Sequence, residues 1–487
     1  MVDLKKPIDF KDPAAPDFLA RIQGNILKGH GRDHTAHLFL RFPAAAAPVR
    51  GWITRFANGE LITADEQRLQ TEAFRAARAA GKPIAGQPFA SFLLSYAGYR
   101  ALEIPAERIP KDSQGFFQVG LKRHNSAQAD QINDPDPSAW EAGYRNELHA
   151  MVLLADDIRT RLDGTVKSIV DALGKLNVES FVERGDKLRF DFGPPRGLLE
   201  IEHFGHQDGI SNPRMTVEDI DEEVKDRGAN LWDPSAPLNL VLTEEPGAAK
   251  AYGSFMVFRK LEQNVRTFTA AKKALATLLR TDPDGAAALM VGRHRDGTPV
   301  IPTTTLTPGA DPNNFNFGAD APPRGTPARL CPFHAHIRRT NPRGDVARYV
   351  PGQTEEFERS MRIARRGITY GERPHLYDTE PWALPEREVG LLFMSFQADL
   401  RQFAIQQGGS DDETFPFVGP PPAFSGLESV VGQAASGATV RPQPWPYRDP
   451  NDPAAIREYK MMNFVKMLGG EYFFAPSVPF LQSLGPA

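Results

Sequence analysis

The stretch HAMVLLADD, residues 149–157, is an almost uninterrupted apolar run of the length that is typical of a buried β-strand. Residues 158–176 follow it with the amphipathic spacing of a helix. The same order recurs in AYGSFMVFRKL, residues 251–261, with a helical pattern over 265–281, and again in GLLFMSFQADLRQFAIQQ, residues 390–407. Strands and helices therefore mix along the chain without regular βαβ alternation. This pattern predicts an α+β fold in which helices lie on antiparallel sheets.

Weaker patterns extend this prediction toward the N-terminus. Residues 34–42 and 187–193 alternate apolar and polar side chains, as strands do, and residues 65–80 have helical spacing. Residues 89–102 are apolar and predict a helix or a strand edge followed by a turn.

The length of the chain, 487 residues, exceeds what one ordinary hydrophobic core supports. An acidic, turn-rich connector over residues 217–247 separates two halves that each contain strands and helices. We therefore predict two domains, residues 1–225 and 226–487, and find no internal repeat of fixed period.

Composition and charge argue against several classes of protein. The formal net charge is -4 and the basic residues are scattered, which argues against a nucleic-acid partner. No run of about 18 apolar residues occurs, so we expect no membrane-spanning segment. The single cysteine, Cys331, forms no intramolecular disulfide, and the N-terminus lacks the apolar core of a signal peptide. We therefore predict a cytoplasmic protein, with secretion as the alternative.

The segment GHQDGISNP, residues 205–213, concentrates polar residues in a loop. Gly205 and Gly209 bracket Asp208, which allows tight turns and a close approach of a planar ligand. A carboxylate in such a loop can transfer protons. An Asp–Gly turn, a common device of loops, is the alternative.

The segment CPFHAHIRRTNPR, residues 331–343, offers two histidines, His334 and His336, with arginines close behind. It lacks the CxxC or HExxH spacing of a zinc site, and the chain has no second cysteine. A single imidazole with cationic neighbours suits a haem better, because histidine binds iron and arginine pairs with a propionate. Two ordinary loop histidines remain the alternative.

The segment IARRGITYG, residues 363–371, places two adjacent arginines before a glycine. They are explained either as a solvated helix end or as a guanidinium that points into a pocket. In a pocket, the guanidinium would stabilise the charge that accumulates on oxygen as peroxide is cleaved.

In this order, the three segments resemble the dye-decolorizing peroxidase family, whose hallmarks are a GxxDG loop, a histidine in an AHIR-type stretch and an arginine before a glycine-containing turn. IQGNILKGHGR (residues 22–32), FMSFQADLRQF (393–403) and GGEYFFAPS (469–477) are similar to further family text. The resemblance extends from about residue 23 to about residue 484. It implies two ferredoxin-like domains, each an antiparallel sheet flanked by helices, and one haem b per chain.

The resemblance also implies roles for particular residues. His336 would be the iron ligand, whereas His334 would not. Asp208 would be the acid–base group on the peroxide side, and Arg365 the arginine beside it.

Further residues would surround the haem. Arg343 would bind a propionate, and Asp399 would accept the second ring N–H of His336. The residues expected to line the pocket, or else to be purely structural, are Leu391, Phe393 and Phe396.

The activity implied is that of a haem peroxidase. Hydrogen peroxide would be reduced, and dyes, phenols or other one-electron donors would be oxidised through a ferryl porphyrin radical. Activity should peak at acidic pH, because an aspartate stays ionised at lower pH than an imidazole. A non-catalytic haem carrier or sensor of the same fold is the alternative, although a carrier needs neither Asp208 nor Arg365. The chain would be a monomer or a homodimer.

Some positions depart from common family text: His206 and Gln207 in the variable pair of the GxxDG loop, Gly367 where some members have asparagine, and Thr369 where proline is usual. Large dyes would need a surface aromatic side chain to relay electrons. The candidates by residue type alone, which are otherwise packing residues, are Trp382, Trp445, Tyr377 and Tyr447.

Overall fold

The computed structural model describes residues 2–82, 84–127, 132–226, 228–301, 313–323, 326–373, 383–413, 425–434, 439–447, 455–461 and 463–486. The helices are α1 (Ala15–Ala20), α2 (Ala46–Gly59), α3 (Ala64–Ala79), α4 (Tyr96–Ala101), α5 (Phe116–Val119), α6 (Leu121–Ala127), α7 (Ala142–Arg145), α8 (Arg159–Gly174), α9 (Val217–Asp221), α10 (Val265–Leu279), α11 (Pro283–Val291), α12 (His336–Thr340), α13 (Asp345–Tyr349), α14 (Glu355–Ser360), α15 (Arg401–Asp411) and α16 (Val478–Gln482). The strands are β1 (His34–Arg41), β2 (Phe89–Leu94), β3 (Ala150–Asp156), β4 (Glu179–Asp186), β5 (Arg189–Asp191), β6 (Leu198–Glu200), β7 (Thr243–Glu244), β8 (Tyr252–Gln263), β9 (Ala364–Arg365), β10 (Ile368–Tyr370), β11 (Gly390–Gln397), β12 (Gln443–Pro446), β13 (Ile456–Tyr459) and β14 (Val465–Ala475).

One large antiparallel sheet runs through the molecule in the order β10-β11-β8-β14-β2-β3-β1-β4. These eight of its ten strands form two four-stranded parts, which join where β14 pairs with β2 at Phe474 and Leu94. The short strands β7 and β9 pair with β8 and β11. In each part the first strand lies between the third and the fourth, and the second lies beyond the third. This is the strand order of a ferredoxin-like fold. The predicted α+β class, with antiparallel sheets and flanking helices, is confirmed.

The two edges of the sheet approach one another, so the sheet curls toward a barrel. The hydroxyl of Thr369 in β10 donates to the Asp186 carbonyl at the end of β4, and the Leu188 N–H donates to the same hydroxyl over 3.1 Å. A Cβ on Gly185 would lie 2.4 Å from Ile368, which shows how closely the edges pack. The hydroxyl of Thr369 therefore joins the two edges of the sheet.

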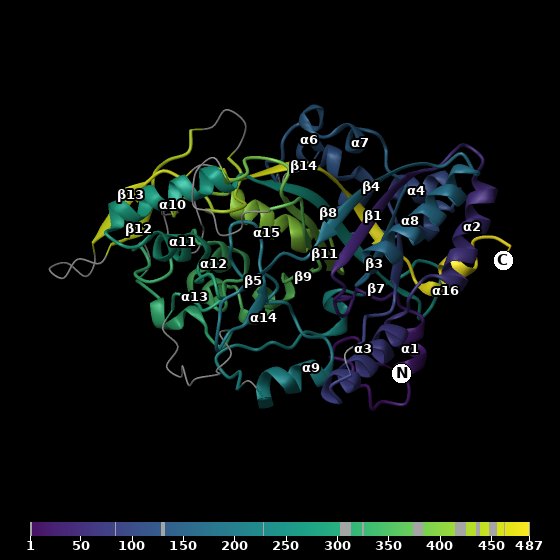
Figure 1. Cartoon of the computed structure of the whole chain (residues 1–487), viewed down its shortest axis with the longest axis horizontal. Coiled ribbons are helices and arrows are strands. Elements are labelled where there is room, and N and C mark those ends of the chain that lie inside the picture. The colour runs from purple at the N-terminus through teal and green to yellow at the C-terminus, as the bar shows by residue number, and fades with distance from the viewer. Residues whose placement is uncertain are drawn as a thin grey trace.

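Helices pack on the sheet and connect its strands (Figure 1). The buried residues of α8 are Leu162, Val166, Ile169 and Leu173, a three- and four-residue spacing that turns one apolar stripe toward the sheet. At the C-terminus, α16 returns to the N-terminal part and lies beside α2, where Thr54 Oγ1 donates to the Leu481 carbonyl over 3.2 Å.

The strongest sequence patterns gave the right elements. The strand predicted within residues 149–157 is β3, and the strand predicted over residues 34–42 is β1. Residues 89–102 divide into β2 and α4, because the Ser95 hydroxyl accepts from the Gly98 N–H and caps the helix. The strand predicted over 187–193 is only the short β5, and β4 just before it was missed. As the edge strand of the sheet, β4 exposes charged side chains, so it lacks a clear apolar pattern.

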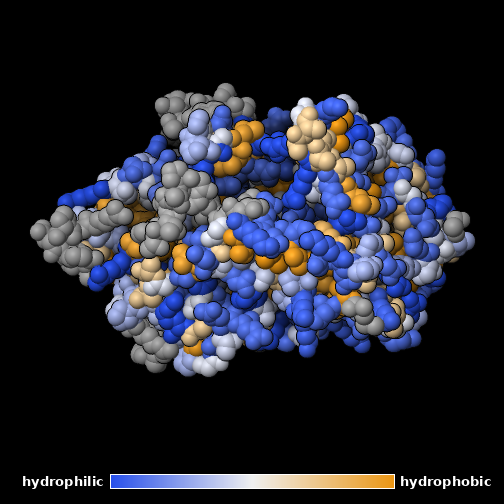
Figure 2. Space-filling view, turned by 90° about the horizontal axis from the view of Figure 1, so that it is seen from below, coloured by the Kyte–Doolittle hydropathy of each residue, from blue (hydrophilic) through white to orange (hydrophobic). Residues whose placement is uncertain are grey.

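The face of the molecule in Figure 2 is mostly hydrophilic, and its hydrophobic side chains occur in small separate groups. In the part of the chain that the structure describes, no helix is both long and apolar enough to cross a membrane.

Candidate active site

A cavity of about 1620 Å³, including the part open to solvent, lies against strands β8 and β11 of the sheet. Strands β8 and β11, helices α12 and α15 and the loop over residues 205–213 all contribute to its wall. The apolar side chains that line it are Phe204, Ile210, Leu261, Val291, Ile337, Ile363, Leu391, Phe393, Phe403, Val430, Val431 and Val465.

His336, the first residue of α12, lines this cavity. Its Nδ1 lies 3.3 Å from Oε1 of Glu428, whose side chain is wholly buried. The Glu428 carboxylate also accepts from the main-chain N–H groups of Val430, Val431 and Gly432 over 2.5–2.9 Å. A ring that donates Nδ1–H to a carboxylate keeps its lone pair on Nε2, and among the described residues no hydrogen bond engages that nitrogen. His336 is therefore prepared to bind a metal through Nε2.

Asp208 and Arg365 line the same cavity and contact each other. Arg365 Nη1 donates to Asp208 Oδ1 over 3.0 Å, and about a third of each side chain is exposed. Gly205 and Gly209 have φ of +94° and +78°, so the two glycines supply the turns that their positions predict. The Asn212 side chain accepts from the Arg365 N–H over 2.9 Å and ties this loop to β9. The structure thus places His336, Asp208 and Arg365 around one cavity.

The predicted pocket lining from β11 is partly wrong. Leu391 and Phe393 line the cavity, but Phe396 lies in the hydrophobic core on the other face of the sheet. Side chains alternate between the two faces of a strand, so residues 393 and 396, three apart, point in opposite directions.

The prediction that Asp399 supports His336 is also wrong. Asp399 accepts from the main-chain N–H groups of Ser113 and Arg401 over 2.7 and 2.9 Å, so its carboxylate caps the start of α15. The carboxylate beside His336 is Glu428, from a segment that the sequence analysis did not single out. A buried acid among apolar neighbours in GLESVVG, residues 426–432, was the available signal.

Similarity to known proteins agrees with this geometry. A multifunctional dye peroxidase, DyP2, from Amycolatopsis sp. is 36% identical over 498 residues, which cover 99% of this chain and 100% of that protein. The crystal structure of a DyP-type peroxidase from Anabaena sp. has a TM-score of 0.83, 37% identity and 99% coverage of both chains. The solved structure of the Amycolatopsis protein also has a TM-score of 0.83, with 34% identity over 99% of this chain and 100% of that chain. No protein-family model matches the chain.

The chain belongs to the dye-decolorizing peroxidase family. It is therefore an oxidoreductase that acts on hydrogen peroxide. Dye-decolorizing peroxidases are haem enzymes, and the cavity fits such a group. The many apolar side chains of the cavity suit a tetrapyrrole. His336 offers the lone pair of Nε2 to iron, while its Nδ1 is bound to the buried carboxylate of Glu428.

Arg343, the predicted propionate ligand of this peroxidase, does not line the cavity. Its guanidinium donates to the carbonyls of Asn313 and Phe315 over 2.7 Å and stacks on Trp232 at 4.3 Å. The arginines that do line the cavity together with Arg365 are Arg259, Arg293 and Arg362, which no sequence motif indicated. Arg362 also lines a separate, neighbouring cavity, which Arg343 lines as well. Burial lowers the pKa of Arg362 to about 10, so it stays charged at neutral pH.

Other histidines and aromatic side chains of the peroxidase take structural positions. His334 is buried against Trp445, its Nδ1 lies 2.7 Å from the Ser425 carbonyl, and burial lowers its pKa to about 3. It is not a cavity residue, in agreement with the resemblance. Trp445 and Tyr447 are buried as well, so neither is the surface relay considered above. The other two candidates, Tyr377 and Trp382, lie outside the described residues.

Proposed function

We propose that this peroxidase holds one haem b in the cavity through His336 and uses Asp208 and Arg365 to activate hydrogen peroxide. The observation that carries the proposal is that these three side chains, from segments up to 157 residues apart, line one cavity whose wall is mostly apolar. The b-type is supported by the only cysteine, Cys331, which is buried outside the cavity lining and leaves no thiol to attach a haem covalently.

The chain's own residues divide the chemistry among them. Haem, when bound, supplies the iron and ring that take up the two oxidising equivalents of peroxide. Asp208 accepts a proton from hydrogen peroxide and returns it to the departing oxygen, so that water can leave. Arg365 donates N–H groups toward the negative charge that grows on that oxygen. Glu428 holds Nδ1–H of His336 and increases the electron donation of the ring.

The donors that we propose are phenols and dyes. One solved dye-decolorizing peroxidase, 25% identical to this chain, is a complex with 2,6-dimethoxyphenol. A cytoplasmic location, a monomer or homodimer, and a domain boundary between residues 225 and 226 stay predictions.

An absorption spectrum of the purified holoprotein tests the proposal. We expect a Soret band, a shift of that band on addition of one equivalent of hydrogen peroxide, and recovery of the first spectrum when 2,6-dimethoxyphenol is added. The pyridine derivative of the extracted haem should have the spectrum of haem b. Absence of a Soret band would overturn the haem assignment, whereas a band that peroxide leaves unchanged would identify a haem carrier or sensor.

A further inference from the structure

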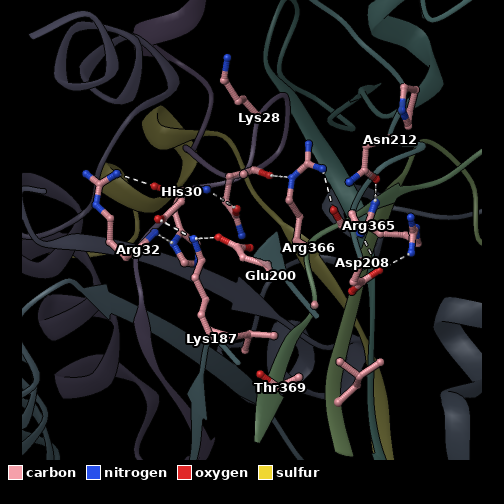
Figure 3. A pocket seen from close by; sticks show the side chains of 18 of the residues that line it. Lys28, His30, Arg32, Lys187, Glu200, Asp208, Asn212, Arg365, Arg366 and Thr369 are labelled. Carbon is pink, nitrogen blue, oxygen red and sulfur yellow. Dashed lines mark hydrogen bonds and ion pairs between the residues drawn. The ribbon is translucent and has the colours of Figure 1, made fainter. Parts of the chain in front are cut away.

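The N-terminal motif IQGNILKGHGR has no part in the proposed chemistry, yet it forms the wall of a second cavity of about 1130 Å³. Within residues 25–32 of the motif, every residue except Ile26 lines this cavity. In Figure 3, His30 and Arg32 lie on one side, Asp208 and Arg365 lie on the other, and Glu200 and Arg366 lie between them. The motif therefore faces the Asp208–Arg365 pair across a cavity that is partly open to solvent.

The second cavity adjoins the haem cavity. The residues that line both are Asp208, Gly209, Arg365, Gly367 and Leu391. Gly367, which has no side chain, lies at this shared wall. A molecule in the second cavity would therefore contact the Asp208–Arg365 pair directly. Its volume far exceeds what hydrogen peroxide alone requires, so it has room for a larger molecule.

Positive charge dominates this space, which we call the basic cavity. Its cationic side chains are Lys28, Arg32, Lys187, Arg214, Arg365 and Arg366. Its carboxylates are Glu200, Asp208 and Asp219. Each carboxylate already has one cation as its partner: Lys187 lies 2.6 Å from Glu200, Lys28 2.5 Å from Asp219 and Arg365 3.0 Å from Asp208. Arg214 pairs with the buried carboxylate of Glu223, which does not line the cavity. Arg32 and Arg366 hydrogen-bond to carbonyl and amide oxygens instead, and these two arginines give the cavity its excess positive charge.

Arg366 contributes most clearly to this excess. It is buried, and its hydrogen bonds within the described part of the chain go to the carbonyls of Asn25, Ile26 and Arg365 over 2.7–2.8 Å. Burial lowers its pKa to about 9, so it remains a cation at neutral pH that no carboxylate hydrogen bond neutralises. A buried cation of this kind attracts an anion into the adjacent space.

His30 adds a neutral donor. Its Nδ1 accepts from the Arg32 N–H over 3.0 Å, so the neutral ring carries its proton on Nε2. Burial and the nearby cations Arg32, Lys187 and Arg366 lower its pKa well below the usual value, which keeps the ring neutral.

We propose that the basic cavity binds the carboxylate or sulfonate of a small phenolic donor and holds its phenol beside the Asp208–Arg365 pair. This inference rests on the proposed function and names its substrate class. Each donor molecule loses one electron and its hydroxyl proton to become a phenoxyl radical. Two such molecules supply the two electrons and two protons that convert one hydrogen peroxide into two waters, and the peroxide-oxidised haem is the oxidant.

Two phenols of similar size and opposite charge test the proposal: 3-(4-hydroxyphenyl)propionate and tyramine. In the wild-type holoenzyme the anionic phenol should have the lower KM. Lys28→Gln or Lys187→Gln should each raise the KM of the propionate about fivefold and leave or lower that of tyramine. Glu200→Gln removes a negative charge from the cavity and should change both constants in the opposite direction.

A matched control is available elsewhere in the chain. Lys272 and Asp284 form an ion pair of 3.0 Å whose side chains are 17% and 54% exposed, against 16% and 50% for Lys187 and Glu200. Neither residue lines the basic cavity or the haem cavity. Lys272→Gln should therefore leave the ratio of the two KM values unchanged.

Binding without turnover gives a second readout. Equilibrium dialysis of the resting holoenzyme should show binding of the propionate that weakens in the Lys28 and Lys187 variants and is absent for tyramine. Equal binding of the two phenols, or a KM ratio that no cavity variant alters, would overturn the proposal. Oxidation of neutral 2,6-dimethoxyphenol separates the outcomes, because its failure in the wild type would contradict the peroxidase proposal itself.

Discussion

The two chemically active parts of the haem cavity differ in how the fold holds them. On one side, His336 rests against Glu428, a carboxylate with no exposed surface that three main-chain N–H groups hold in place. On the other side, Asp208 and Arg365 bond chiefly to each other, are about a third exposed, and adjoin the basic cavity. The Glu428 carboxylate is thus buried and held by the main chain, whereas both members of the Asp208–Arg365 pair are partly open to solvent.

This difference follows from what each side has to do. A metal ligand has to keep one tautomer and one orientation, which a buried carboxylate with fixed partners provides. A proton-transfer pair has to exchange protons and admit peroxide, which a fully buried ion pair could not do. Changes on the His336 side should therefore alter haem binding and redox properties, and changes on the Asp208–Arg365 side should alter the reaction with peroxide.

The largest effect is expected for His336→Ala. Loss of an outer partner alone costs about 10–100-fold in metal affinity, so loss of the ligand should weaken haem binding by at least about that factor. The ratio of Soret to protein absorbance after purification measures it, and circular dichroism controls for folding. Wild-type haem content would refute the ligand assignment and with it the contrast between the two sides.

Arg365→Leu should leave haem bound and slow its reaction with hydrogen peroxide about 10²- to 10³-fold, the cost of one lost donor to a developing oxyanion. Stopped-flow absorbance under excess peroxide gives the rate constant. An unchanged rate would assign the role to another cation of the cavity, such as Arg362.

Glu428→Gln should retain haem but raise the reduction potential of the iron by tens of millivolts. The substitution replaces the negative carboxylate beside Nδ1 of His336 with a neutral amide, so the imidazole donates less electron density. About 59 mV corresponds to a tenfold change in the relative stability of the two oxidation states. Asp399→Asn is the matched control, since that carboxylate caps α15 and should leave the potential unchanged. A shift of the potential in the Asp399 variant but not in the Glu428 variant would identify Asp399 as the partner of His336, as the family resemblance implied.

The smallest effect concerns Asp411, which anchors the segment that carries Glu428 by accepting from the Gln433 N–H over 2.7 Å. Burial raises its pKa to about 8. Between the ordinary value of about 4 and that pH, the folded chain binds more protons than the unfolded chain, so stability falls as pH rises. Asp411→Asn should reduce the decrease in Tm between pH 5 and pH 8 by at least about 2 °C, as measured by thermal unfolding. An identical decrease in both proteins would show that Asp411 is ionised throughout.

Local sequence was sufficient where chemistry depends on residue type and nearby backbone. The GHQDG loop needs two glycines at positive φ around one acid, and the apolar runs at 149–157 and 251–261 contain enough local pattern to identify β3 and β8. It was insufficient where a residue is defined by its partner. Asp399 and Glu428 are both acids near apolar segments, and only the packing of the chain places one at a helix start and the other beside His336.

The sequence by itself determined the fold class and the family resemblance, and it singled out His336, Asp208 and Arg365 as candidate site residues, because these features lie in short segments with recognisable local patterns. The tertiary structure decided which carboxylate meets His336 across 92 positions, which face of β11 each phenylalanine occupies, and that the N-terminal motif lies against the catalytic loop. The physical reason is that contacts between distant segments depend on strand parity and packing of the whole sheet, which no local pattern contains.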